Sequence, residues 1–252
     1  MTFPDDPAAV PVATAPLGDR FVARRGRPTG FTPADLVFGA GLDDAIARVQ
    51  RERGARTRAV AAILLLDRYA LRLTPPVLAA FTQLDVLLDA RPAAVSLGPD
   101  ERVPGWVAFA ADGVPAHGDR AALRRSLLTE GLLPVADALA ARTRASPRLL
   151  RGAVAHAVAL SYLHLSWPCP DHDRHTGAAR ELLCAAELDE LVAVDDVVVD
   201  GRAWTSVERR TCCLAFRCTG AHGWCGTCPC RPAADIAADV AAACRSYAAR
   251  HP

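Results

Sequence analysis

The stretch Arg210-Thr-Cys-Cys-Leu-Ala-Phe-Arg217, with Gly223-Trp-Cys-Gly-Thr-Cys228 behind it, decides how the C-terminal part of this chain folds. It contains an adjacent pair of cysteines, Cys212 and Cys213, and a C-x-x-C pair, Cys225 and Cys228, with eleven residues between the pairs. Four thiolates from one short segment are typical ligands of a soft metal ion or an iron–sulfur cluster. The segment is therefore a candidate metal centre that holds a strand end, a loop and the last helix together.

Two further cysteines, Cys218 and Cys230, lie in the same segment and are alternative ligands. A C-x-x-C turn lets two thiolates converge on one centre, and we expect Gly226 to take a positive φ there. The adjacent pair is less usual, because neighbours on a regular strand point to opposite faces. Both Cys212 and Cys213 can bind only if the chain bends or the strand ends there; otherwise one of them is not a ligand.

This cysteine pattern resembles the C-terminus of the FhuF family of ferric-siderophore reductases, in which Cys-Cys and C-G-x-C are separated by about ten residues. The resemblance extends more diffusely upstream, through Arg58–Ala80 and Ser146–His156, and covers roughly residues 56–230. It implies a cytoplasmic oxidoreductase that reduces ferric iron held by hydroxamate-type siderophores. It also implies that a 2Fe–2S cluster is bound by Cys212, Cys213, Cys225 and Cys228.

Two other classes of protein remain open. Zinc also favours four thiolates, so the segment could stabilise a siderophore- or protein-binding module without redox activity. An electron-carrier protein is the third alternative. Disulfides are disfavoured, because no export signal opens the chain and the number of cysteines is odd. We expect the remaining cysteines, Cys169, Cys184 and Cys244, to be buried as small apolar residues.

Composition and motifs limit which kinds of binding partner the sequence predicts. The formal net charge of the 252 residues is +1, which predicts no bulk attraction to nucleic acid or to an anionic membrane. The longest apolar run, Ala59–Leu66, is far shorter than the ~20 residues of a membrane-spanning helix. No dinucleotide fingerprint, P-loop or G-x-S-x-G motif is present. We therefore expect electrons to come, one at a time, from a separate ferredoxin or flavodoxin-type protein.

The apolar spacing predicts an α+β fold that is mostly helical, with short antiparallel hairpins and a C-terminal cysteine-rich loop. Helices are expected at 42–53, 57–72, 74–84, 119–143, 147–166, 176–186 and 232–249, and strands at 85–88, 94–97 and 105–110 that form an antiparallel meander. A second β region is expected at 190–217, where Asp200-Gly201 predicts a two-residue hairpin turn. A strand at Arg209–Phe216 in this region would carry the adjacent cysteines. The expected organisation is a loose leader at 1–30, a substrate-side region at 31–189 and an iron–sulfur region at 190–252.

Several polar side chains near the cysteines are candidate contacts for a siderophore or a donor protein. Arginine suits both carboxylate ligands and acidic protein surfaces. The candidates are Arg202, Arg209, Arg210 and Arg217, together with Trp224 beside Cys225. The alternative roles are a solvated strand face for the arginines and loop packing for Trp224.

Histidines offer a rival site. A segment at 167–175 contains Cys169, Asp171, His172, Asp173 and His175, but it lacks standard zinc spacing and reads as a polar loop. His222 could tune the cluster or replace a ligand. His156 is expected to be an interior histidine with satisfied hydrogen bonds rather than a ligand.

Overall fold

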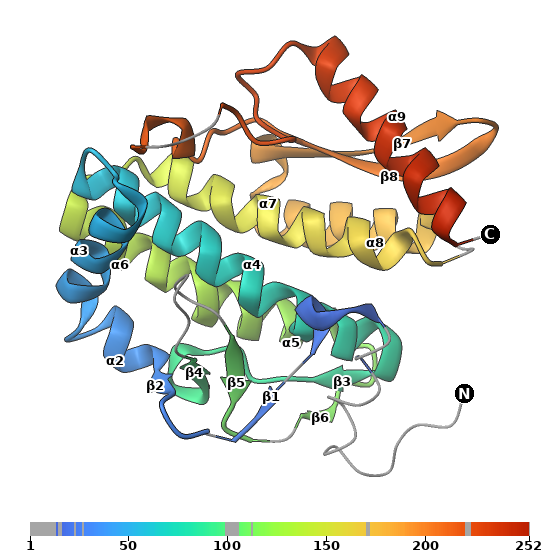
Figure 1. Ribbon diagram of the computed structural model, residues 1–252. Coiled ribbons are helices and arrows are strands. Elements are labelled where there is room, and N and C mark those ends of the chain that lie inside the picture. Colours follow the sequence, from blue (N-terminus) through green and yellow to red (C-terminus); the bar gives the residue numbers. More distant parts are fainter. Residues whose placement is uncertain are drawn as a thin grey trace.

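The computed structural model describes residues 14, 17–22, 24–26, 28–98, 106–111, 113–169, 172–219 and 223–251. Its fold is α+β, as the sequence predicts. Two long helices, α4 (Arg58–Leu84) and α7 (Pro147–Ser166), run through the middle of the molecule. Small strands lie on one side of them, and a hairpin covered by the last helix lies on the other (Figure 1).

The helices follow the predicted pattern with two corrections. The helices expected at 57–72 and 74–84 are one helix, α4, with Pro75 and Pro76 inside it. Both prolines are buried in the core, and this packing offsets the backbone hydrogen bonds that they cannot donate. The helix α8 (His172–Ala185) begins earlier than expected, so His172 and His175 lie on a helix and not in a loop.

The remaining helices are short or lie at the edges of the long ones. They are α2 (Ala34–Phe38), α3 (Leu42–Arg53), α5 (Arg120–Arg124), α6 (Leu133–Thr143) and α9 (Ala233–Arg250). A π-helical segment, Arg125–Leu132, joins α5 to α6, so the helix expected at 119–143 is continuous. Among the helices that the structure describes, none is both long and apolar enough to cross a membrane.

The strands near the N-terminal half do not form the expected meander. A four-stranded sheet has the order β1-β5-β4-β2, from β1 (Arg24–Arg25), β5 (Val107–Phe109), β4 (Val95–Leu97) and β2 (Thr32–Pro33). The pair β4 and β5 is antiparallel, as expected, whereas β1 pairs with β5 in parallel. The strand β3 (Val86–Leu87) pairs instead with β6 (Val114–Pro115), because the chain returns to it after β5.

The predicted C-terminal hairpin is present. It consists of β7 (Val192–Val199) and β8 (Arg202–Arg209), which pair antiparallel along their whole length. Asp200 and Gly201 form the turn with φ values of 51° and 79°, the positive φ that this turn type requires. The expectation of a strand at Arg209–Phe216 is corrected: β8 ends at Arg209, so Cys212 and Cys213 are not on a strand.

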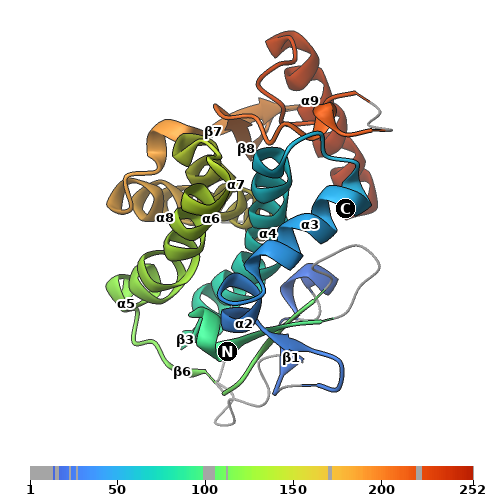
Figure 2. The ribbon, with the colours of Figure 1, turned by 90° about the vertical axis from the view of Figure 1, so that its left-hand side faces the viewer.

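A main hydrophobic core fills the space between the helices, and a smaller one joins α9 to the hairpin. In the smaller core, the rings of Trp167 and Trp204 meet edge to face with centroids 5.4 Å apart, and Tyr247 of α9 packs 6.0 Å from Trp204. The last helix is thereby fixed over the strands that lead into the cysteine segment (Figure 2). The division of the chain at residues 30 and 189 stays a prediction.

Candidate metal centre

The first cysteine pair lies where the chain leaves the hairpin. After β8 ends at Arg209, Cys212 and Cys213 follow in irregular structure, and Leu214 takes a left-handed conformation with φ of 59°. This residue turns the chain into a short 3-10 turn, Ala215–Arg217. Because the strand has already ended, the two neighbouring thiols are not forced to opposite faces of a sheet.

The C-x-x-C pair lies in a turn that is tied to the last helix. The backbone N–H of Cys228 donates to the carbonyl of Cys225 at 3.0 Å. The guanidinium of Arg231 donates to the carbonyl of Gly226 at 3.1 Å and forms an ion pair at 2.7 Å with Asp239 of α9. The positive φ expected at Gly226 is absent; it occurs at Gly223, with φ of 80°, where the chain enters the turn.

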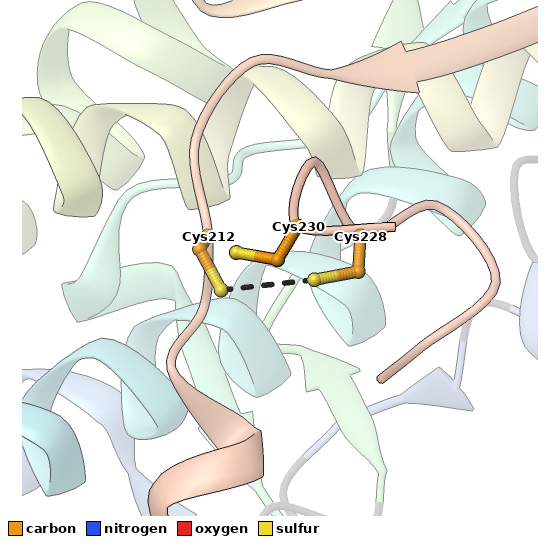
Figure 3. A group of neighbouring side chains, drawn as sticks. All are labelled: Cys212, Cys228 and Cys230. Atoms are coloured by element: carbon orange, nitrogen blue, oxygen red, sulfur yellow. Dashed lines mark hydrogen bonds between the residues drawn. The ribbon is translucent and has the colours of Figure 1, made fainter. Parts of the chain in front are cut away.

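Thiols from the two segments meet in space (Figure 3). The Sγ atoms of Cys212 and Cys228 are 3.9 Å apart, and those of Cys212, Cys228 and Cys230 all lie within 4.8 Å of one another. This group of three thiols could bind a metal ion. The thiols of Cys213 and Cys225 contact each other and form a second pair, and Cys225 also lies close enough to Cys228 for the two to interact electrostatically.

Cys218 lies to one side of this cysteine cluster. It pairs with Ala55 in an isolated β-bridge, and the next residue, Thr219, donates its N–H to the carbonyl of Gly54 at 3.0 Å. These contacts anchor the segment after the 3-10 turn to the loop between α3 and α4. Of the two alternative ligands, Cys230 is the one whose thiol joins Cys212 and Cys228.

Burial and mutual contact control the ionisation of these thiols. Burial raises the pKa of Cys212 to about 12, and contact with Cys225 followed by burial raises that of Cys213. The same contact with Cys213 lowers the pKa of Cys225 to about 7. Neighbouring thiols do not all ionise by themselves, because the thiolate charges repel one another. A bound metal cation offsets that repulsion and favours the thiolate forms. The donor chemistry therefore fits a thiolate-ligated metal group.

A buried arginine lies beneath the cysteines. Arg209 has a side chain that is 2% exposed, and its Nη1 is 3.1 Å from Oδ1 of Asp67 on α4, whose side chain is 16% exposed. Its Nε donates to the carbonyl of Thr211 at 3.1 Å. Its charge opposes part of the rise in the pKa of Cys213 and contributes to the lowered pKa of Cys225. Arg209 was predicted as a surface contact for a siderophore or a donor protein. Its position does not support that role, because the guanidinium faces the interior.

One donor of this guanidinium has no partner within the described part of the chain: Nη2 of Arg209 is buried without a hydrogen bond. A buried cation with a spare N–H near several thiols provides what an anionic, thiolate-bound group requires. Opposite it, burial raises the pKa of Asp67, and the charge of Arg209 opposes that rise.

The helix α7 supports the cysteines from the other side. Nε2 of His156 is 3.2 Å from Oγ1 of Thr227, the residue inside the C-x-x-C turn, and its Nδ1 is 4.0 Å from Oδ1 of Asp67. Burial lowers the pKa of His156 to about 3, so the imidazole is neutral at neutral pH. His156 is an interior residue, as predicted, but its hydrogen bonds are not all satisfied as expected, because Nδ1 is buried with no hydrogen-bond partner among the described residues. Its link to the C-x-x-C turn has no signal in the sequence.

Close packing fixes the segment before Cys212 on the same helix. A Cβ atom at Gly152 of α7 would lie 1.9 Å from Oγ1 of Thr211 and 2.7 Å from its Cβ. Only glycine allows this approach. Asp67, Gly152 and Thr227 were not predicted as site residues; the position of Thr227 between Cys225 and Cys228 is the one sequence signal that could have identified any of them.

The other predicted contact residues are exposed. Arg210 and Arg217 lie on the surface near the cysteines, Arg217 over the ring of Phe216 at 5.6 Å, and Trp224 is 53% exposed. Arg202 lies at the opposite end of β8, with its guanidinium 4.1 Å from the ring centroid of Trp204. Arg202 is therefore remote from the cysteine cluster.

The cysteines outside the cluster differ in burial. Cys244 is buried in the smaller core, as predicted, and Cys169 is half-buried. The prediction was wrong for Cys184, which is exposed because it lies on the outer side of α8. His222 and Asp171, which the sequence also singled out, lie outside the described residues.

A second group of potential ligands surrounds His172. Its Nε2 is 3.0 Å from a carboxylate oxygen of Asp173 and 3.6 Å from one of Asp196. The side chains of Asp173 and Asp196 are 80% and 40% exposed. His175, predicted in the same loop, is buried and faces the ring of Tyr162 instead.

No protein-family model matches this chain, and no curated protein matches it. Among solved structures, ATP-bound aerobactin synthetase IucA from a hypervirulent pathotype of Klebsiella pneumoniae is similar to it, with 17% sequence identity and a TM-score of 0.44. The similarity covers 52% of this chain and 29% of the synthetase. A likeness of this size assigns neither a fold family nor an activity.

Proposed function

We propose that this protein is a ferric-siderophore reductase that binds a 2Fe–2S cluster through Cys212, Cys213, Cys225 and Cys228. One observation carries the proposal: thiols from two separate cysteine pairs meet above the buried guanidinium of Arg209. The resemblance of this cysteine pattern to the FhuF family supports the choice of an iron–sulfur cluster over a single metal ion.

The proposed reaction moves one electron. A separate ferredoxin or flavodoxin-type protein loses one electron, and siderophore-bound Fe(III) becomes Fe(II). A cluster bound by Cys212, Cys213, Cys225 and Cys228 would supply the one-electron relay between the two. Hydroxamate oxygens are hard donors that hold ferric iron far better than ferrous iron, so the reduced complex releases its metal. We place the reaction in the cytoplasm and the cluster in the region 190–252.

The residues of this chain have separate tasks in that reaction. Arg209 and His156 hold the cysteine segments, and the buried positive charge of Arg209 stabilises thiolates against protonation. The exposed side chains around the cysteines, Arg210, Arg217 and Trp224, form the surface that a donor protein or a siderophore would contact. Arg202 is too far along β8 to contribute to that surface.

Two measurements test the proposal in sequence. Protein purified without oxygen should show visible absorption and contain about two irons and two sulfides per chain. Chemically reduced protein is then mixed with a ferric hydroxamate and a ferrous trap in anaerobic stopped flow. Oxidation of the cluster together with formation of the ferrous complex supports the reductase. A cluster that stays reduced with hydroxamate and catecholate chelates alike assigns the protein to the electron carriers.

A zinc-stabilised binding module is the second candidate. The observation in its favour is the tight group of Cys212, Cys228 and Cys230, which would give a zinc ion three thiolate ligands. Colourless protein with one zinc per chain would support it.

Two single substitutions distinguish the ligand sets. Cys230→Ser should leave the cluster intact, and Cys213→Ser should perturb it. The reverse result would exchange the two residues in the ligand set.

A further inference from the structure

A cavity of about 710 Å³ lies between α4, α7, the end of α9 and the short turn Asp19–Phe21. Its lining is cationic. It includes Arg20, Arg68 and Arg72, whereas Asp19 is the one acidic residue among the lining residues. The volume suits a small organic ligand rather than a protein segment.

The cavity is lined by the same faces of α4 and α7 that support the cysteines, farther along each helix. On α4, Leu71 and Pro75 line the cavity and follow Asp67 at intervals of four residues, which places all three on one face. On α7, the lining residue Leu160 lies four residues after His156. Four residues of helix rise about 6 Å. The near wall of the cavity therefore begins about one helical turn from the two side chains beneath the cysteine cluster.

The positive charges of the cavity act on one another. Desolvation, followed by the charge of Arg72, lowers the pKa of Arg20. Burial, followed by the charge of Arg20, lowers the pKa of His164 to about 4, so this histidine adds no charge at neutral pH. Two guanidinium groups that repel each other beside a cavity favour an anion between them, because it offsets the repulsion.

We propose that this cavity binds the substrate of the reductase, and that the substrate is a ferric chelate with net negative charge that carries free carboxylate groups. The inference rests on the proposed function. Arginine pairs with carboxylates through two parallel hydrogen bonds, which orients a ligand as well as holding it. The carboxylates lie at Arg20 and Arg72, and the iron lies toward the cysteine side. A cationic chelate is rejected by the same arginines.

The test uses two gallium(III) chelates that share one metal-binding core and end in opposite charges. One is a linear trihydroxamate that ends in an ammonium group; the other is the same chelator after succinylation of that amine, so that it ends in a carboxylate. Their binding to the cluster-loaded protein is measured by calorimetry. We expect the carboxylate form to bind about tenfold more tightly or better, with an advantage that shrinks as salt is added. Equal affinities for the two complexes overturn the proposal.

Variants locate the binding. Arg20→Gln and Arg72→Gln should each weaken the carboxylate complex about tenfold, whereas the ammonium complex should bind at least as tightly as before, because a repelling charge has been removed. Arg51→Gln, which removes an exposed arginine of α3 that does not line the cavity, is the matched control and should change neither. Unchanged affinity in both cavity variants overturns the assignment. Thermal unfolding checks that each variant folds, and Arg20→Lys provides a milder replacement if Arg20→Gln does not.

A third arm separates the chelate from a simple carboxylate. If the metal-free succinylated chelator binds as tightly as its gallium complex, the ferric-chelate part of the proposal fails. Gallium(III) accepts no electron from a ferredoxin-type centre, so binding is measured without turnover. If the chelates do not bind here, the cavity proposal fails, but the stopped-flow result with other ferric chelates still stands. If the protein binds the anionic chelate but transfers no electron, the reductase function fails and the binding site remains.

Discussion

The cysteine cluster and the group around His172 both bring metal-ligating side chains together, but they are built differently. The cysteines lie against α4 and α7, with a buried Arg209–Asp67 ion pair below them. The His172 group lies at the surface, and its two carboxylates are 80% and 40% exposed. Exposed acidic groups are common without a ligand, whereas burying a cation beside crowded thiols costs free energy unless anionic groups pair with it. The support beneath a group of ligands is therefore more informative than the group itself.

The largest difference between the two groups should appear in metal content. Cys212→Ser and Cys228→Ser each remove a thiol shared by the four-cysteine set and the group of three. We expect iron, sulfide and visible absorption to be lost in both variants, because a serine hydroxyl is a poor ligand for a soft centre. His172→Ala should retain full iron and sulfide content. Loss of iron in His172→Ala with retention in Cys212→Ser would invert the comparison.

The next difference concerns stability. Arg209→Met removes one partner of the buried pair and leaves Asp67 uncompensated, which costs roughly 3–5 kcal/mol. Arg180→Met removes one partner of Asp196, at 3.4 Å, in the exposed group, where both side chains are at least 40% exposed, and should cost about 0–1 kcal/mol. Urea unfolding of the metal-free proteins measures both. The double variant Arg209→Met/Asp67→Leu should recover most of the loss, because no unpaired charge remains; equal costs for the two single variants would show that burial does not distinguish the groups.

Packing below the cysteines gives a smaller difference. Gly152→Ala would place a Cβ atom 1.9 Å from Oγ1 of Thr211, so the cysteine segment must shift, at a cost of roughly 1–3 kcal/mol. Gly177→Ala on α8, near the His172 group, meets nothing within 4 Å and should stabilise the protein by up to ~1 kcal/mol. Thermal unfolding and iron content are measured together. A neutral effect of Gly152→Ala on both would mean that the segment is not fixed to α7 as the structure has it.

The two regions also differ in how far the sequence predicts them. The hairpin turn Asp200-Gly201 and the helix periodicity are local signals, and both elements formed where expected. The spacing of the cysteines predicted which segment would gather thiols. The support beneath them was not predictable, because its contacts join residues far apart in the chain: Arg209 and Asp67 are 142 positions apart, and His156 and Thr227 are 71. Pro75 and Pro76 misled the prediction for a related reason: they predicted the start of a new helix, but tertiary burial keeps one helix continuous through them.

The smallest expected effect is a pH dependence that originates beneath the cysteines. The pKa of His156 is about 3 in the folded protein, below its ordinary value of 6.5, because burial disfavours the imidazolium. The unfolded chain then binds a proton that the folded chain does not, so stability is complete above pH ~6.5 and falls as the pH decreases toward 3. Between about pH 7.5 and 5.5, this one residue should account for a loss of ~1.4 kcal/mol in the unfolding free energy.

The variant His156→Gln tests this dependence. It keeps a hydrogen-bonding side chain opposite Thr227 but cannot be protonated, so its unfolding free energy should fall by that much less over the same range. Chelator is present in both series, which excludes metal release as a cause. Parallel curves for the wild type and His156→Gln would mean that the imidazole is not buried against the C-x-x-C turn, and the support that distinguishes the cysteines from the His172 group would lose one of its two sides.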